Sequence, residues 1–516
     1  MSSPSKQPAE LLAEGMALFQ RRQFEEALRI IGESLAADPA QPLALNNQGV
    51  ALQQLDRHAE ALASFDRAIG IGGNIPDIHF NRGLSLQALH RINEALAAYD
   101  KALALRPGYP AALNNRGNVL REMERYDDAL ASFDRAIGLQ PDYAEAWNNR
   151  GNALRRMRRN EDAIASYDKA TELKPDFARA WYHRGIALQE LRRHDEALES
   201  YDRAIAIQPD FADAQWSKGF VKLLTGDFAG GWPLYEWRWK MSDFLAPRRA
   251  FRQPQWTGMQ DINGKTVLLH AEQGFGDTIH FCRYARRIFL LGAKIVLEVQ
   301  PALKSLMQSL EGPAQVIAHG EALPDFDYHC PLLSLPLACG TRPDNIPAAI
   351  PYLRAPDERR EFWTQKLGPK RKRRVGLVWS GNPKQKNDFN RSMSLFDIMP
   401  FASCDVELYS LQKDLGIADR IMLAGTPKIG IPELGDFADT AALMEHMDIV
   451  ITVCTSAAHL AGALGRPVWI LLSHTACWRW MLDRSDSPWY PTARLFRQTV
   501  PGEWGDVVEA VKKELT

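Results

Sequence analysis

The chain has 516 residues, of which 46% are hydrophobic and 24% are charged. This length predicts several domains, and this composition is typical of a soluble globular protein. The net charge of −1, from 62 basic and 63 acidic residues, argues against nucleic acid or an anionic membrane as the partner.

The N-terminal segment MSSPSKQPAELLAEG is polar and lacks the apolar core of a secretory signal. No apolar run approaches the ~18 residues that a membrane span requires. The six cysteines all lie in the second half and none forms a CxxC pair, so we interpret them as reduced thiols. We therefore expect a cytoplasmic protein without a membrane span.

A 34-residue repeat occupies the first half of the chain. Glycine recurs with this period at positions 49, 83, 117, 151, 185 and 219, and alanine recurs with it from position 27 to position 197. Each unit carries two blocks of helical apolar spacing, which predicts pairs of antiparallel helices stacked into an α-solenoid. The pattern resembles the tetratricopeptide repeat (TPR), which would cover residues 8–245 as six repeats and a degraded seventh.

An asparagine recurs at one position of the first helix in successive units: Asn47, Asn81, Asn115 and Asn149. If this position faces the concave side, the amides would form an acceptor-binding ladder, because an amide both donates to and accepts from an extended peptide backbone. In the alternative interpretation, each asparagine forms hydrogen bonds between neighbouring units.

The helical period stops near residue 245, and short apolar strands then alternate with helices. This alternation predicts parallel βαβ units. The predicted strands are 265–271, 293–299, 314–320, 373–381, 405–412, 448–454 and 466–473, and a further strand and helix share 327–340. The other predicted helices are 278–292, 301–310, 396–404, 439–447 and 456–465. We therefore expect two Rossmann-like lobes, residues 246–355 and 370–516, with a ligand cleft where strand carboxyl ends meet helix N-termini.

The stretch HAEQGFGDTIHFCRYA, residues 270–285, sets two glycines and a carboxylate at a predicted strand-to-helix turn. Gly274 and Gly276 permit a close approach of ligand or backbone. Asp277 is either the N-cap of the helix or a general base in the cleft, and His280 is a rival base. A nicotinamide enzyme is disfavoured, because Ile279 stands where the third glycine of G-x-G-x-x-G belongs.

A second small-residue turn, VCTSAAHLAGALGRP, spans residues 453–467. Thr455 and Ser456 begin a helix whose free N–H groups and dipole would bind a diphosphate. His459, one turn further on, would contact ribose or phosphate. The alternative is a capped core helix that packs through alanine and glycine.

A polar loop, WSGNPKQKNDFNRSMSL, spans residues 379–395. Ser380 and Asn382 follow a predicted strand, and Lys384, Lys386 and Arg391 could neutralise a leaving diphosphate. The alternative is a solvated loop. Because no Asp-x-Asp or zinc-type spacing accompanies these residues, we expect no metal and no cofactor.

Residues 245–516 resemble bacterial glycosyltransferases of the GT-B fold, close to the heptosyltransferase-like group. The matching stretches are EQGFGDTIHFCRY, GLVWSGNPKQKNDFNRS, LYSLQ, TSAAHLAGALGRPVWILL and WRWMLDRSDSPWYPTARLFRQ. With its repeat array, the chain is similar in plan to the O-linked N-acetylglucosamine transferases. The resemblance implies an α-solenoid followed by an α/β GT-B fold, and inverting, metal-independent transfer from a nucleotide-diphosphate sugar to a hydroxyl of a protein or peptide held by the TPR array.

The resemblance also assigns residues. Asp277 matches the proposed base, and Arg391 or Lys386 would hold the phosphates. Thr455, Ser456 and His459 match the nucleotide-binding helix start, and Gln412 would lie near the nucleobase or ribose. Cys454 departs from the pattern, because relatives usually carry Asp there. This departure motivates the alternative of a TPR interaction scaffold with a degenerate, non-catalytic glycosyltransferase domain.

Overall fold

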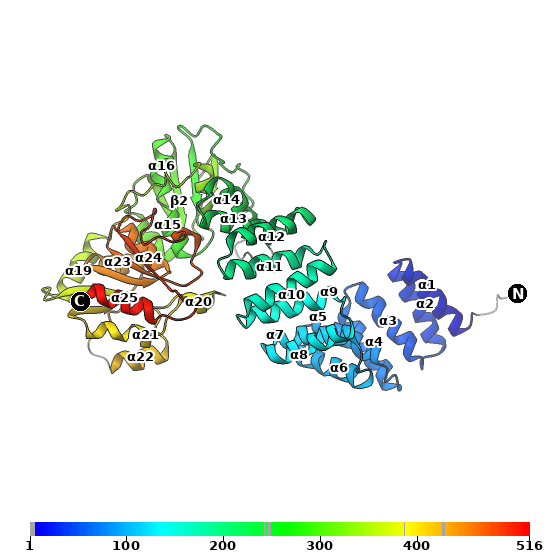
Figure 1. Cartoon of the computed structure of the whole chain (residues 1–516). Helices are drawn as coiled ribbons and strands as arrows, with labels where there is room; N and C mark the ends of the chain where they lie inside the picture. The colour runs from blue at the N-terminus through cyan, green and yellow to red at the C-terminus, as the bar shows by residue number, and fades with distance from the viewer. Residues whose placement is uncertain (1–5, 242–243, 245–248, 386, 426–428) are drawn as a thin grey trace. The chain divides into compact units, whose positions relative to one another are not determined.

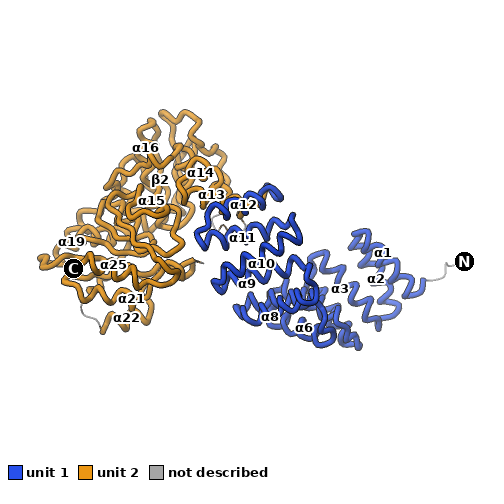
Figure 2. The backbone as a smooth tube through the Cα atoms, viewed as in Figure 1, with its two compact units in different colours: residues 1–209 blue, residues 210–516 orange. Residues whose placement is uncertain are grey.

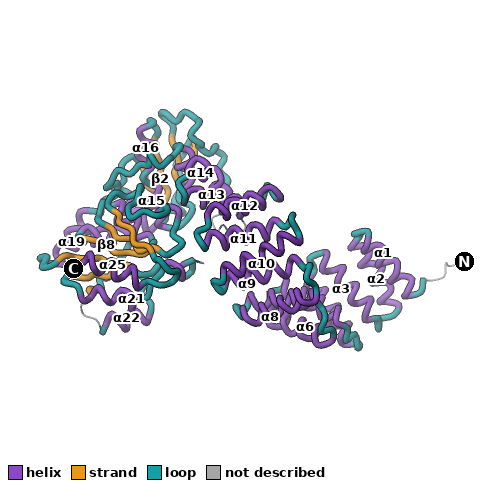
Figure 3. Tube along the Cα trace, viewed as in Figure 1, coloured by secondary structure: helices purple, strands orange, loops and turns teal. Residues whose placement is uncertain are grey.

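The computed structural model describes residues 6–241, 244, 249–385, 387–425 and 429–516. The chain divides into two compact units, residues 1–209 and 210–516 (Figure 2). The first unit consists of helices, and the strands all lie in the second (Figure 3).

The first unit is a series of helix pairs in which each helix packs against the next (Figure 1). Its helices are α1 (Pro8–Gln20), α2 (Phe24–Ala37), α3 (Pro42–Gln54), α4 (His58–Gly70), α5 (Pro76–Ala88), α6 (Ile92–Leu105), α7 (Pro110–Glu122), α8 (Tyr126–Leu139), α9 (Ala144–Arg156), α10 (Asn160–Leu173), α11 (Ala178–Glu190) and α12 (His194–Ile207). This arrangement agrees with the solenoid that the 34-residue period predicts.

The recurring glycine of each repeat lets the two helices of a pair approach closely. A Cβ atom built on Gly117 would lie 2.5 Å from the ring of Phe133, sixteen residues further on, and Gly49, Gly83, Gly151 and Gly185 meet their aromatic rings at the same distance. The turn between the two helices is fixed by a left-handed residue, Glu124 in this repeat, with φ of 59°. The 34-residue period of the glycines therefore reflects the close packing of the two helices in each repeat.

Substituting alanine at Gly117 is expected to destabilise the first unit by about 1–3 kcal/mol, because the new methyl group would overpack the Phe133 ring. Gly138 is the matched control, since it lies in α8 with no atom within 4 Å of a built Cβ. Gly138→Ala should raise stability by about 0.5–1 kcal/mol through helix propensity alone. Urea denaturation followed by far-UV circular dichroism measures both; equal effects of the two substitutions would contradict the steric argument.

The second unit begins with α13 (Ala212–Leu224), α14 (Phe228–Tyr235) and a 3₁₀ turn, η1 (Glu236–Lys240). The repeat pattern predicts that this segment belongs to the solenoid, up to residue 245, whereas the compact units divide after Pro209. Trp232 of α14 is buried, donates a hydrogen bond to the Thr341 carbonyl at 3.0 Å and packs edge-on against Trp478. The aromatic end of the last helix pair thus forms part of the α/β core; residues 245–248, at the predicted domain boundary, lie outside the described residues.

A four-stranded parallel sheet follows, with strand order β3-β2-β1-β4. Its strands are β1 (Thr266–His270), β2 (Lys294–Val299), β3 (Pro313–Ala318) and β4 (Tyr328–Pro331), and its helical segments are α15 (Phe275–Phe281), α16 (Tyr284–Leu290), η2 (Pro301–Leu303), α17 (Lys304–Met307), η3 (Leu332–Ser334) and α18 (Leu335–Ala338). The predicted helix 278–292 is interrupted at Cys282 and Arg283, where the Arg283 side chain is drawn into buried hydrogen bonds with Tyr352 and the Trp489 carbonyl.

A six-stranded parallel sheet, order β10-β9-β8-β5-β6-β7, completes the unit. Its strands are β5 (Arg373–Val378), β6 (Val406–Ser410), β7 (Ile429–Gly430), β8 (Ile449–Val453), β9 (Val468–Leu472) and β10 (Ala493–Arg497). Its helical segments are α19 (Asp357–Leu367), α20 (Asp388–Arg391), α21 (Leu395–Ile398), η4 (Met399–Ser403), α22 (Ile417–Ala424), α23 (Phe437–Glu445), α24 (Ser456–Ala463), η5 (Trp478–Trp480) and α25 (Gly505–Leu515). Parallel strands alternating with helices confirm the α/β prediction. Among the described residues, no helix combines the length and apolar character needed to cross a bilayer.

Candidate functional site

Two strand-to-helix turns, one from each sheet, meet at the helices α15 and α24. Gly274 and Gly276 follow β1, and Thr455 and Ser456 follow β8. The two helices pack against each other, and a Cβ on Gly276 would lie 3.1 Å from the His459 ring and 3.3 Å from the Ser456 Cα atom. Gly276 is therefore required by the close approach of the two helices, and the motifs singled out from the sequence lie side by side.

Asp277 occupies the first turn of α15, but it is not the N-cap, which is Gly274. Its Oδ1 atom accepts a hydrogen bond from Arg479 Nη2 at 2.6 Å, and the Arg479 side chain is only 8% exposed. The Asp277 side chain keeps 22% of its surface exposed, and its Oδ2 atom accepts no hydrogen bond from the described residues. The carboxylate is thus held in place through one oxygen, while the other has no hydrogen-bond partner among the described residues.

His280 and His459 are joined by one tyrosine in the interior. His280 Nδ1 lies 2.9 Å from the Tyr490 hydroxyl, and His459 Nδ1 lies 3.0 Å from the same oxygen. Burial holds the pKa of both imidazoles well below the ordinary value. His280 has no exposed surface, so an acceptor substrate does not reach it and it is not placed to act as the base. It is a neutral side chain that connects α15 to α24 through Tyr490.

The N-terminus of α24 is surrounded by cationic and neutral groups. Thr455 caps the helix by accepting a hydrogen bond from the Ala457 N–H, and Arg391 Nη1 donates to the Cys454 carbonyl at 3.1 Å. The Cys454 thiol accepts a hydrogen bond from Trp480, and burial raises its pKa to about 11, so it is neutral at pH 7. This thiol therefore adds no negative charge at the N-terminus of α24.

The loop after β5 lies beside Arg391. The Ser380 N–H donates to Gln412 Oε1 at 3.2 Å, and Asn382 Oδ1 accepts from the Lys384 N–H at 3.0 Å. A Cβ on Gly381 would collide with Asp388 and Arg391, which form an ion pair at 3.0 Å. Ser380, Gln412 and Arg391 are therefore brought to one edge of the six-stranded sheet; Lys386 lies outside the described residues.

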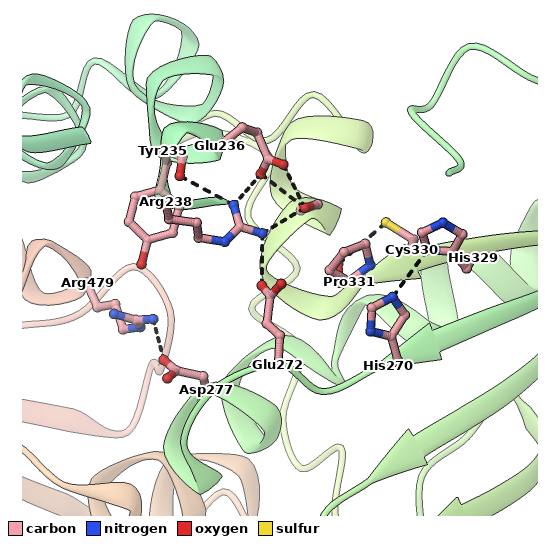
Figure 4. A network of polar contacts seen from close by, with 11 residues as sticks. Tyr235, Glu236, Arg238, His270, Glu272, Asp277, His329, Cys330, Pro331 and Arg479 are labelled. Atoms are coloured by element: carbon pink, nitrogen blue, oxygen red, sulfur yellow. Dashed lines mark hydrogen bonds and ion pairs between the residues drawn. The ribbon is translucent and has the colours of Figure 1, made fainter. Parts of the chain in front are cut away.

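A further polar network was not singled out from the sequence. Arg238 of η1, whose side chain is 1% exposed, pairs with Glu236 at 2.6 Å and with Glu272 at 2.9 Å, and it also donates to Ser334 (Figure 4). Burial raises the pKa of Glu272 to about 7, and its Oε2 atom is buried without a hydrogen-bond partner. Perturbed carboxyl groups of this kind are common at functional sites.

Neither Arg479 nor Glu272 was predicted as a site residue. Both residues lie in stretches that carry the resemblance, Arg479 in WRWMLDRSDSPWYPTARLFRQ and Glu272 in EQGFGDTIHFCRY. No local sequence pattern indicated their roles, because their partners are distant in the chain. Arg479 and Asp277 are 202 residues apart, and Arg238 and Glu272 are 34 residues apart.

The first unit contains a hollow of ≈ 560 Å³ along the asparagine positions. It is lined by Asn114, Asn148, Asn149 and Asn152, by Arg121, Arg155, Arg156 and Arg179, and by His183, Tyr143, Phe177 and Glu145. Asn149 donates to Asn114 at 2.9 Å, and Asn81 donates to Asn46 at 3.0 Å. Asn47 and Asn115 accept from the preceding asparagine of their own repeat. Asn81 and Asn149 thus connect neighbouring repeats, and of the four predicted positions only Asn149 lines the hollow.

Among the described residues, no three His, Cys, Asp or Glu side chains are grouped so that they could hold a metal ion.

Comparisons with known proteins identify the repeats. Models of the tetratricopeptide repeat match residues 12–75 and 148–212, 76–109 and 98–131, and a TPR repeat model matches residues 117–157. The first part of the chain, to about residue 212, therefore consists of TPR repeats, which confirms that part of the prediction and supports protein or peptide binding.

The chain is also similar to protein FlbA of Caulobacter vibrioides, with 26% identity over 323 residues, which is 56% of this chain and 52% of FlbA. It thus spans about half the length of this relative. Among solved structures, YrrB, a TPR protein with an unusual peptide-binding site, is 24% identical, with 36% of this chain and 97% of YrrB covered and a TM-score of 0.32. PilF of Pseudomonas aeruginosa is 19% identical, with 40% and 95% covered and a TM-score of 0.37.

Proposed function

We propose that residues 210–516 form a glycosyltransferase of the GT-B type, which moves a sugar from a nucleotide-diphosphate sugar to a hydroxyl of a protein or peptide held by the TPR repeats. One observation carries this proposal: the partly exposed carboxylate of Asp277 and the capped N-terminus of α24 lie on two helices in direct contact. A proton acceptor and an anion-binding helix end are thereby set close together.

In this mechanism Asp277 acts as the general base. Its Oδ2 atom accepts the proton of the acceptor hydroxyl while that oxygen attacks the anomeric carbon. The bond from the anomeric carbon to the diphosphate breaks, and the nucleoside diphosphate leaves with the electron pair. The N–H groups at Thr455–Ala457 and the Arg391 guanidinium would stabilise its negative charge. Arg479 would fix the orientation of the base through Oδ1.

Nucleotide binding tests the donor half of the proposal. In a thermal-shift panel of nucleoside diphosphates, one member is expected to stabilise the chain by about 2.7 kcal/mol at a concentration of 100 times its Kd. Arg391→Gln should remove most of this shift, whereas Arg494→Gln, which breaks an exposed ion pair with Glu514, should leave it intact. A panel without any shift would overturn the donor site.

A TPR scaffold with a non-catalytic second unit is the other candidate, and two observations favour it. Cys454 stands where the resemblance to the heptosyltransferase-like group implies an aspartate, and Asp277 is tied to a buried arginine, as a structural residue would be. Absence of a nucleotide shift, together with protein binding by the TPR repeats, would select this function.

A further inference from the structure

A second hollow, of ≈ 420 Å³, lies in the second unit at the carboxyl edge of the four-stranded sheet. Its walls include Trp239, Arg249, His270, Glu272, Glu298 and His319. The volume falls within the ~300–1,000 Å³ typical of small-molecule sites, and the carboxyl ends of parallel strands are where such ligands bind. Neither Asp277 nor the α24 N-terminus is among its lining residues.

The strand pleat explains why polar side chains gather there. His270 of β1 and Glu298 of β2 are register partners, so they share one face of the sheet. Ile317, the partner of Glu298, lies on that face too, and His319 follows two residues later. One layer further down, Leu268 and Val296 form a buried apolar cluster with Ile317. The hollow thus has a polar floor on an apolar base.

Two buried polar atoms at this hollow have no hydrogen-bond partner among the residues that the structure describes. Glu272 Oε1 pairs with Arg238, but Oε2 is buried and accepts no hydrogen bond. His270 Nε2 lies 3.2 Å from His329 Nδ1, whereas His270 Nδ1 is buried without a partner. Both residues are almost completely buried: 2% of the Glu272 side-chain surface and 3% of the His270 surface are exposed. A buried polar atom without a hydrogen-bond partner costs folding free energy, so a ligand that paired with both atoms would recover that cost.

The charged side chains at the hollow are already paired, and Arg238 is shared by Glu236 and Glu272. Glu272 pairs with Arg238, and Glu298 forms an ion pair with Arg249. Burial lowers the pKa of His270 to about 3, so its ring is neutral at pH 7. With a pKa of about 7, Glu272 is partly ionised at pH 7, so its Oε2 atom offers an acceptor in the ionised form, and His270 offers a neutral ring nitrogen. Hydroxyl groups suit both atoms, because a hydroxyl can donate to the first and either donate to or accept from the second.

We propose that this hollow is a sugar-binding site, in which one ring hydroxyl donates to Glu272 Oε2 and a second forms a hydrogen bond with His270 Nδ1. The ligand class is a neutral, polyhydroxylated ring. The site is distinct from the Asp277 site, and the proposal does not depend on sugar transfer, because it requires neither a nucleotide nor turnover.

The experiment uses the full chain and two sets of probes. The first set is glucose, galactose, mannose, rhamnose and N-acetylglucosamine as free monosaccharides, and the second is their methyl glycosides, which stand for glycan-attached residues. Saturation-transfer NMR reports binding. Fluorotryptophan labelling, with Trp239→Phe to assign the resonance, reports whether the hollow is the place of binding, since Trp239 lines it.

At least one probe is expected to give saturation transfer and to shift the Trp239 resonance. Glu272→Gln, which puts an N–H₂ group where Oε2 now accepts, should weaken this binding about tenfold or more. Glu311→Gln, at an exposed position of the same sheet region, should change nothing. Preference for one probe set identifies free or attached sugar as the ligand.

Failure of every probe to bind would overturn the site, as would binding that leaves the Trp239 resonance unmoved. The Trp239 shift in the unsubstituted chain decides the matter even where Glu272→Gln alters folding. The nucleotide panel is a separate measurement, so this proposal and the transferase proposal fail independently.

Discussion

Replacing Asp277 by asparagine is expected to slow sugar transfer by about 10²–10⁴-fold, the range that a general base contributes. Asparagine keeps an oxygen for Arg479, which donates to Asp277 Oδ1 at 2.6 Å, but it cannot take up the proton of the acceptor. Nucleotide binding should remain nearly unchanged, because α24 and Arg391 would supply the contacts to the diphosphate. Asp277→Ala should give the same loss of turnover.

The measurement is mass spectrometry of acceptor proteins in a lysate treated with the chain and the nucleotide sugar selected by the thermal-shift panel, with calorimetry for nucleotide binding. Asp486→Asn is the matched control, since it also changes an aspartate that pairs with an arginine, here Arg484 at the surface. If Asp277→Asn retained the wild-type rate, Asp277 would be only the structural partner of Arg479.

Replacing Arg238 by methionine is expected to destabilise the second unit by about 3–5 kcal/mol at pH 8, because Glu272 would remain buried without its cation. Arg238 also pairs with Glu236, so the substitution breaks a network rather than a single contact. All but two of the 14 tryptophans lie in this unit, so tryptophan fluorescence during urea denaturation follows its unfolding.

The destabilisation caused by Arg238→Met should depend on pH. In the folded protein, with Arg238 in place, the pKa of Glu272 is raised to about 7, above its ordinary value. Folding therefore favours the protonated carboxyl. The stability that this provides is present at low pH and is lost as pH rises through the folded pKa. Removing the arginine raises that pKa further, and the destabilisation should therefore shrink at pH 5.

Two further variants test this explanation. The double variant Arg238→Met/Glu272→Gln should recover much of the loss, because it leaves no buried charge at this position. Arg484→Met, which breaks the exposed pair with Asp486, should cost at most about 1 kcal/mol. A loss at Arg238 that stayed the same at both pH values and in the double variant would point to packing rather than charge.

Much of the fold followed from local patterns. The 34-residue recurrence of glycine and alanine predicted the helix pairs. Each repeat needs a small residue where its two helices pack closely, as Gly117 does against Phe133. Apolar runs between helical stretches predicted the parallel strands. The helices α19, α20, α22 and α25 and the strands β7 and β10 were not predicted. The interruption at Cys282–Arg283 had no local signal, because the partners of the Arg283 side chain, Tyr352 and Trp489, are distant in the sequence.

The candidate site was predicted in part. The motifs at Gly274–Asp277 and Thr455–His459 were recognisable as strand-to-helix turns, and the structure places them in contact. Their assigned roles, and the GT-B architecture, remain predictions. The asparagine positions were visible as well, but which of two uses they serve depends on geometry, and Asn149 donates to the neighbouring repeat.

The sequence by itself determined the periodicities: 34 residues for the TPR helix pairs and the alternation of strand and helix in the second unit. These arise from short-range sterics and burial, which neighbouring residues encode. Only the tertiary structure decided that Arg479 holds Asp277, that Tyr490 joins two histidines and that Glu272 is buried against Arg238. Such pairs form where strands and helices far apart in the chain pack together, and the burial that results sets their charge and their chemistry.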